Sequence, residues 1–131
     1  MTIDFPTVIT KFDNILSRGL CAGLGTVTGQ MCVEAAITQA LGQPFSDEPD
    51  CVTSSVRRFK IRLNDSYRWV SAASRATGLR DLGIAQIGSK GIVDGNEFCK
   101  LLAKATIQVL IPALFRDVNP GKWVTLVDEC E

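Results

Sequence analysis

The residue types that most often carry out catalysis are largely missing from this chain. It contains no histidine among its 131 residues, and histidine is the side chain that most often serves as a general base near neutral pH. No Ser-His-Asp triad and no Cys-His pair can be built without it, and zinc sites that use histidine ligands are excluded as well. We therefore expect a protein without enzymatic activity.

Five cysteines remain as candidate reactive or metal-binding groups: Cys21, Cys32, Cys51, Cys99 and Cys130. No two of them form a C-x-x-C pair, so their spacing gives no indication of a zinc site. An odd number would leave one thiol over in a complete disulfide framework. We expect reduced, mostly buried thiols in a cytoplasmic protein, with no metal and no cofactor. The alternative is a reactive Cys21 or Cys51, both of which fall in predicted loops.

A glycine-rich segment just ahead of a predicted helix is the first candidate binding site. Residues 19–29 hold four glycines, and the backbone N–H groups of such a loop can converge on an anion at a helix N-terminus. A dinucleotide fingerprint would need a preceding strand, whereas the preceding segment here has helical periodicity. The alternative is a tight connection between packed helices. The hypothesis assigns a phosphate-bearing ligand to Gly23, Gly25, Thr26, Thr28 and Gly29.

A basic segment, residues 57–80, is the second candidate. It holds half of the fourteen basic residues against a single acid, Asp65, although the whole chain has zero formal net charge. Six of its seven cations are arginines, whose forked guanidinium suits phosphate and carboxylate, and aromatic residues that could stack on a base lie among them. The alternative is a solvated face that pairs with the acidic connection before it or with the acidic C-terminus. The proposed ligand-binding residues are Arg57, Arg58, Arg62, Arg68 and Trp69.

Hydrophobic periodicity predicts a mainly α fold. Apolar residues recur at intervals of three and four over much of the chain. The predicted helices lie between the caps Asp4 and Gly19, at about 28–41, at 71–87 and after the cap Asp94. Gly78 and Gly83 each cost a helix about 1 kcal/mol relative to alanine, and such glycines usually permit close packing or mark a break. With the segment discussed next, we expect about five helices in a single compact domain over residues 1–131.

Residues 57–64 are ambiguous between a helix and a strand. As a helix they would bury Val56, Phe59 and Leu63 and leave Ile61 on the outer face among charges. As a strand they would alternate apolar and basic residues and would pair with a short C-terminal strand, which would change the class to α+β. We favour the helix because the neighbouring elements are helical and the preceding serines are good caps.

The longest predicted helix becomes apolar almost all round at residues 107–115. This stretch is either the centre of the core or a helix–helix interface in a homo-oligomer, and Pro112 should kink or end the helix nearby. No apolar run reaches the roughly 18 residues of a membrane span, and we expect neither a membrane segment nor a secretory signal. The proposed interface residues are Ile61, Ile107, Leu110, Ile111, Leu114 and Phe115.

Two functions fit these patterns. The first is a small non-catalytic cytoplasmic binding protein that acts through protein–protein contacts, forms a homo-oligomer and has an unknown protein partner. The second is a binder of a nucleotide or nucleic acid through residues 23–29 and 57–80. A stand-alone inhibitor or sequestering protein of the kind found in mobile elements would fit either of them.

Overall fold

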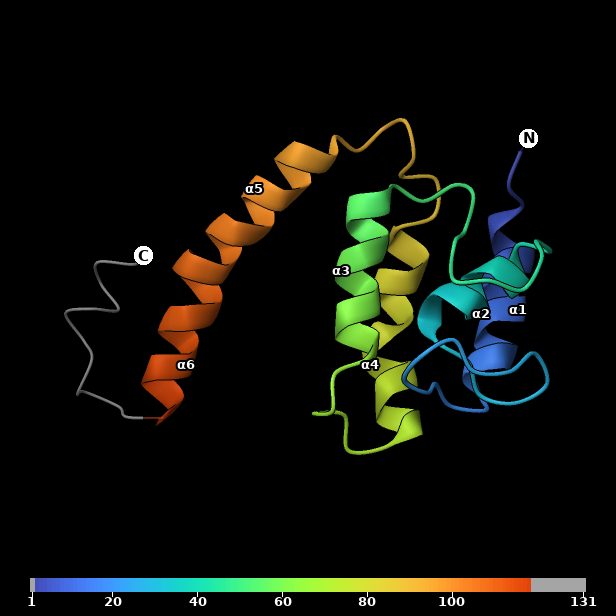
Figure 1. Ribbon diagram of the computed structural model, residues 1–131, viewed down its shortest axis with the longest axis horizontal. Helices are drawn as coiled ribbons and strands as arrows, with labels where there is room; N and C mark the ends of the chain where they lie inside the picture. Colours follow the sequence, from blue (N-terminus) through green and yellow to red (C-terminus); the bar gives the residue numbers. More distant parts are fainter. Residues whose placement is uncertain (1, 119–131) are drawn as a thin grey trace. The chain divides into compact units, whose positions relative to one another are not determined.

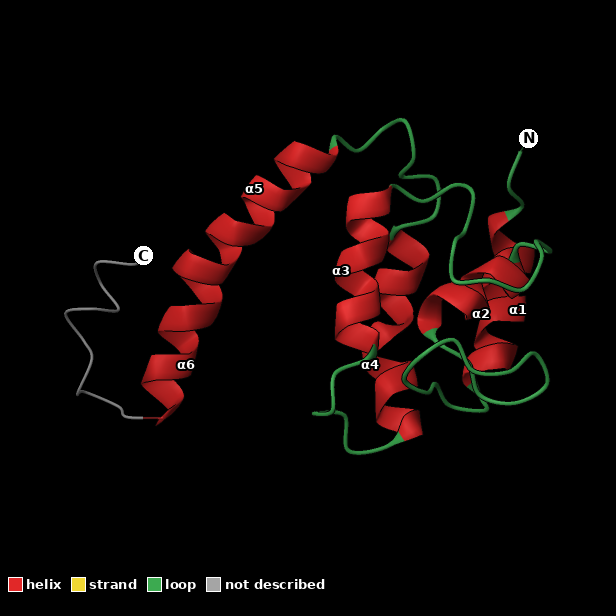
Figure 2. Cartoon of the chain, in the orientation of Figure 1, coloured by secondary structure: helices red, strands yellow, loops and turns green. Residues whose placement is uncertain are grey.

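The chain is mainly helical in the computed structural model, which describes residues 2–118 and shows only isolated bridges, and no strand, within them (Figure 2). The mainly α prediction is therefore confirmed. Residues 57–64 lie in a helix, so the strand alternative for them is wrong. The predicted C-terminal strand lies outside the described residues.

Internal contacts divide the chain into two units, Met1–Val93 and Asp94–Glu131. The first unit contains α1 (Phe5–Leu16), α2 (Val33–Ala40), α3 (Ser54–Asn64) and α4 (Ala72–Ala85), as Figure 1 shows. In the second unit α5 (Gly95–Ala105), the π-helical turn η1 (Thr106–Leu110) and α6 (Ile111–Val118) follow one another without a break. We expected about five helices. The described residues form four helices in the first unit and one continuous helix in the second, which agrees with that number. The single domain over residues 1–131 stays a prediction.

Three helices begin at predicted capping residues, and in each of them the capping side chain accepts a hydrogen bond from a backbone N–H of the first turn. Asp4 accepts a hydrogen bond from a backbone N–H of the first turn of α1, and Asp94 does the same for α5. Ser71 and Ser74 form a reciprocal capping box at the start of α4. Each cap satisfies an N–H group that has no partner inside its helix, and such a cap is typically worth about 1 kcal/mol.

The segment before α2 is a folded loop, so the predicted helix start near residue 28 is wrong. The N–H of Thr26 donates to the Gln30 carbonyl at 2.9 Å and closes a turn. Gly25 in this turn has φ +77°, and a Cβ there would lie 2.3 Å from the Gln30 carbonyl oxygen. Only glycine permits so close a backbone approach at positive φ. Helix α2 begins after this turn, at Val33.

Helix α2 is the centre of the first unit. Seven of its eight residues are buried, and it contacts α1, α3 and α4. Large apolar side chains with almost no exposed surface surround it, each contributing about 1.5–3 kcal/mol by burial. They are Phe12, Leu20, Met31 and Leu79, and Ile37 of α2 is fully buried as well.

Helix α4 approaches its neighbours closely at its two interior glycines. A Cβ on Gly83 would lie 2.7 Å from the ring of Phe12, which is fully buried against it. A Cβ on Gly78 would lie 2.6 Å from the ring of Trp69. The prediction that these glycines permit close packing is therefore confirmed.

The helix of the second unit does not end at Pro112, contrary to one form of the prediction. Proline has no N–H, and its ring clashes with the carbonyl four residues earlier. Here the π turn η1 directly precedes the proline and changes the hydrogen-bond register before it is reached. Such π turns commonly accommodate a break in the regular ladder.

We expect Gly83→Ala to destabilise the first unit. Helix propensity alone would favour alanine, but the added methyl group has to displace the buried ring of Phe12. Overpacking of this kind costs about 1–3 kcal/mol in free energy of unfolding. Urea denaturation measures it, with the exposed Thr77→Ala on the same helix as the control that should change stability by less than about 0.5 kcal/mol. A gain of about 1 kcal/mol for Gly83→Ala would contradict the close packing.

Candidate binding surfaces

The glycine loop is held by contacts within the first unit. The N–H of Gly23 donates to the carboxylate of Asp65 at 2.8 Å, and the N–H of Gly29 donates to the Thr26 carbonyl at 3.3 Å. A carboxylate thus already occupies the position in which a phosphate would accept from Gly23. The predicted residues Gly23, Gly25, Thr26 and Thr28 are exposed, and Gly29 is half-buried.

The anion-binding hypothesis places a ligand at the N-terminus of α2. A side chain of the neighbouring helix α3 accepts a hydrogen bond there instead. Asn64 of α3 is fully buried, and its Oδ1 accepts from the N–H of Val33 at 3.0 Å. Its Nδ2 donates to the Cys21 carbonyl and to Asp65. No local sequence pattern predicts this cap, because Asn64 lies 31 positions from Val33.

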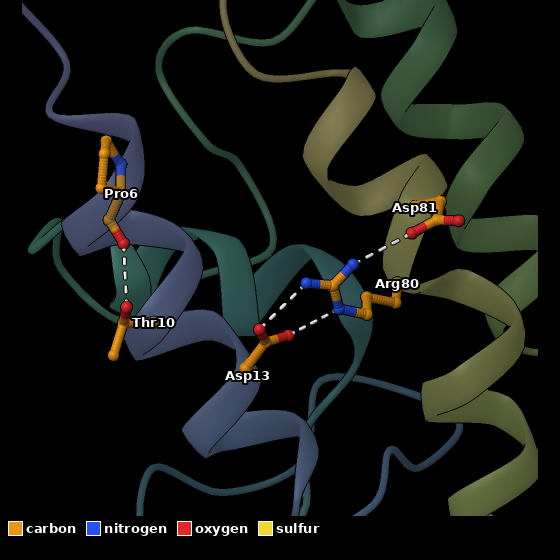
Figure 3. A network of polar contacts seen from close by, with 5 residues as sticks. All are labelled: Pro6, Thr10, Asp13, Arg80 and Asp81. Carbon is orange, nitrogen blue, oxygen red and sulfur yellow. Dashed lines mark hydrogen bonds and ion pairs between the residues drawn. The ribbon is translucent and has the colours of Figure 1, made fainter.

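Two arginines of the basic segment are engaged by acids. Arg57 pairs with Glu48 at 2.6 Å, which is a contact that the solvated-face alternative expected. Arg80 of α4 holds Asp13 of α1 through Nε at 2.7 Å and Nη2 at 2.9 Å, and its Nη1 reaches Asp81 at 3.1 Å (Figure 3). The hydrogen bonds from Arg80 hold the pKa of Asp13 below its ordinary value.

The remaining predicted cations are exposed. Arg58 and Arg62 lie on the outer side of α3 and form no ion pair with any other residue between 2 and 118. Arg68 is exposed and places its guanidinium 5.2 Å from the ring centroid of Tyr67, which is itself 85% exposed. These residues keep the solvent access that ligand binding requires.

Trp69 is not arranged as a stacking surface. Its Nε1 donates to the Leu63 carbonyl at 2.8 Å, and its half-buried ring packs against the backbone of α4 at Gly78. The indole therefore links the end of α3 to α4. The ring area that packs against Gly78 is therefore not open to a nucleotide base.

One open pocket of about 310 Å³ adjoins the start of α3. Arg57, Arg58 and Lys90 contribute its cations, and Glu48 and Asp50 contribute its acids. Because two carboxylates almost balance three cations, the pocket offers a phosphate little net attraction.

The most deeply buried charges of the described chain form a node that the sequence analysis did not predict. Lys60 Nζ of α3 lies 3.1 Å from Glu34 Oε1 of α2, and both side chains are at most 2% exposed. Gln86, the C-cap residue of α4, donates from Nε2 to Glu34 Oε2 at 2.9 Å. We call Glu34, Lys60 and Gln86 the buried node, and it joins three helices of the first unit.

Burial dominates the electrostatics of the node. Removal from water raises the pKa of Glu34 and lowers the pKa of Lys60, while the charge of each partner opposes these changes. Nearby, burial raises the pKa of the Cys32 thiol to about 11, so this thiol stays protonated and unreactive at neutral pH. Cys32 is buried as expected, whereas Cys99 is exposed.

The node corrects the predicted orientation of α3. Val56, Phe59 and Leu63 are only half-buried, and the fully buried positions of the helix are Lys60 and Asn64. Lys60 belongs to the basic segment, residues 57–80, for which both interpretations expected solvent-accessible cations. The one signal that separates it from its neighbours is that it is the only lysine among six arginines.

The predicted interface residues fall into two groups. Ile61 is half-buried in the first unit. In the second unit Ile107, Leu110 and Leu114 are 52%, 59% and 61% exposed, and Ile111 and Phe115 are half-buried. The apolar stretch therefore does not form the closed core that was one of its two interpretations. Sequence reasoning missed two further exposed residues of the same helix, Leu101 and Val109.

The helix Gly95–Asp117 has the length and composition of a membrane span, with 23 residues and a mean hydropathy of 1.6 over its most apolar window. Lys100 and Lys104 lie within this helix, so no uninterrupted apolar run in it reaches 18 residues. The absence of a membrane segment stays a prediction. Helices from the cores of soluble proteins pass the same test, so this match assigns no membrane by itself.

Neither a metal site nor a known relative gives this chain a function. No group of three His, Cys, Asp or Glu side chains between residues 2 and 118 is placed to hold a metal ion. No protein-family model, no curated protein and no solved structure matches the chain. A proposal for the function therefore rests on the surfaces of the chain itself.

Removing one member of the buried ion pair should cost about 3–5 kcal/mol of unfolding free energy, because the other charge is left buried alone. The two single variants should differ in pH dependence. In Lys60→Met the folded pKa of Glu34 stays above its ordinary 4.5, so stability is full at low pH and is lost as the pH rises. In Glu34→Gln the folded pKa of Lys60 stays below its ordinary 10.5, so stability is lost as the pH falls.

Urea denaturation over a pH series measures both slopes. The double variant, Glu34→Gln with Lys60→Met, is the control, and it should lose less stability than the two single variants summed. Slopes of the same sign in the two single variants would show that the pair is not buried as described.

Proposed function

We propose that the protein is a non-catalytic binding protein that acts through protein–protein contacts made by the helix of its second unit. The observation that carries this proposal is the exposure of four large apolar side chains along one helix. Leu101, Val109, Leu110 and Leu114 are each 59–64% exposed. With the exposed Ala105 and Ala113 they form what we call the apolar stripe.

The members of the apolar stripe lie in two neighbouring rows along the helix. Leu101, Ala105, Val109 and Ala113 are four residues apart and form the first row, which runs through the π turn η1, and Leu110 and Leu114 form the second. Contiguous exposed apolar surface on a soluble protein usually marks an interaction site. Covering one leucine completely contributes about 1.5–3 kcal/mol.

The first unit supports this role as a scaffold. Its apolar side chains surround α2, and many of its polar groups are used internally, in the cap by Asn64, the buried node and the Arg80–Asp13 pair. A stand-alone inhibitor that masks a partner surface would act through the same apolar stripe.

The nucleotide or nucleic-acid alternative retains one supporting observation. Arg58, Arg62 and Arg68 are exposed on neighbouring parts of the chain. Against it stand the carboxylate of Asp65 at the glycine loop and the packed ring of Trp69. The protein-contact function therefore ranks first.

Photo-crosslinking tests the proposed function. Benzoylphenylalanine replaces Val109 in the full chain, and the protein is irradiated in cells. We expect covalent adducts to protein, because the probe lies in the apolar stripe. The same amino acid at Tyr67, whose side chain is 85% exposed against 62% for Val109, is the control and should give far fewer adducts. Equal labelling from both positions, or no protein adduct from Val109, would contradict the proposal.

A further inference from the structure

We infer that the outer side of α3 and the loop after it bind a single strand of nucleic acid, with Tyr67 as the residue that stacks on a base. The surface consists of three exposed arginines and one exposed aromatic ring. We call it the arginine–tyrosine surface, and its members are Arg58, Arg62, Arg68 and Tyr67. It lies within the first unit, so this inference goes beyond the proposed function and does not rest on it. It uses neither the glycine loop nor Trp69.

Two of the arginines are placed to follow a nucleic-acid backbone. Arg58 and Arg62 are four positions apart on α3, so they lie one helical turn apart on the same side, with Cβ atoms about 5–6 Å from each other. Neither forms an ion pair with any other residue from 2 to 118. Two guanidinium groups at this spacing can contact successive phosphates of an extended strand, and each offers paired N–H donors to a phosphate.

The acids near this surface are few, and the cations outnumber them. Glu48 is held in an ion pair by Arg57, and the carboxylate of Asp65 accepts from a backbone N–H of the glycine loop. Asp50 lines a pocket with Arg58 at the start of α3, where it repels a polyanion. The favourable path for an anionic strand therefore runs from the middle of α3 toward the loop that follows it.

Tyr67 lies in that loop, which joins α3 to α4 (Figure 1), and is placed to stack on a base. Its side chain is 85% exposed, and the guanidinium of Arg68 lies 5.2 Å from its ring centroid. Bases of a single strand stack on such exposed rings, and an adjacent arginine adds a cation–π contribution. The bases of a duplex are already stacked on one another, so this ring favours a single strand.

The combination favours nucleic acid over an acidic segment of a protein. Carboxylates could pair with the three arginines, but an acidic peptide has no planar group to stack on the ring of Tyr67. A nucleotide strand supplies both a phosphate for each guanidinium group and a planar base for the ring.

Fluorescence anisotropy of the full chain with a fluorescein-labelled oligothymidylate of about 12 nucleotides tests the phosphate contacts. A plot of the logarithm of the binding constant against that of the salt concentration should have a slope of about −2, because each of three contacts to a single strand contributes about 0.7. Arg62→Ala should reduce the slope by about 0.7. Lys11→Ala, which removes an exposed positive charge from α1, is the matched control and should leave the slope unchanged. No binding at about 20 mM salt, or an unchanged slope in Arg62→Ala, would overturn the inference.

Fluorine NMR tests the stacking. Tyr67 is the only tyrosine of the chain, so labelling with 3-fluorotyrosine gives a single resonance. Oligothymidylate should shift this resonance, because the ring current of a stacked base acts on it. Tyr67→Ala should weaken binding by about tenfold, whereas Tyr67→Phe keeps the ring and should stay within about twofold of the native chain. A resonance that does not move at saturation, or native affinity in Tyr67→Ala, would contradict the stacking role.

A poly-glutamate peptide of the same length distinguishes the two classes of partner. We expect it to bind more weakly than oligothymidylate at the same salt concentration and to leave the fluorotyrosine resonance in place. A peptide that binds as tightly as the oligonucleotide would assign the arginine–tyrosine surface to an acidic protein segment and overturn the inference.

Discussion

The arrangement of the first unit depends on the ion pair between Glu34 and Lys60. Two charges removed from water destabilise a fold unless they meet in good geometry with their remaining valences satisfied. Lys60 Nζ and Glu34 Oε1 lie 3.1 Å apart without forming a hydrogen bond, whereas Glu34 Oε2 accepts one from Gln86. The attraction between the two buried charges favours the packing of α2 beside α3, and the hydrogen bond from Gln86 links the pair to the end of α4.

The same constraint explains how the basic segment is used. A run of cations on an amphipathic helix ordinarily indicates a solvated face, but turning Lys60 inward places the outer arginines in water and brings Asn64 to the start of α2. Asn64 then accepts a hydrogen bond from the N–H of Val33 in the first turn of α2. Of the predicted anion-binding residues, Gly23, Arg57 and Trp69 are held by contacts within the first unit, whereas Arg58, Arg62 and Arg68 remain exposed.

The sequence was sufficient for the features that depend on near neighbours. The helical class and the caps at Asp4, Ser71 and Asp94 follow from periodicity and local chemistry. It was insufficient where distant segments meet. The side chains of Lys60 and Trp69 have polar ends that bond to groups placed by the fold, and no local pattern indicates those partners. Whether the apolar stripe is exposed likewise depends on which segments pack against it, and no local pattern predicts those.

The central claim is that the second-unit helix is the surface through which the protein binds. Hydrogen–deuterium exchange with and without the protein that crosslinks to position 109 tests it most directly, because local protection reports which segments become covered. The account predicts that backbone amides of α5, η1 and α6 become more protected when that protein is bound, while those of α2 and α3 do not change. Protection that rises in α3, or that is unchanged along the second-unit helix, would contradict it.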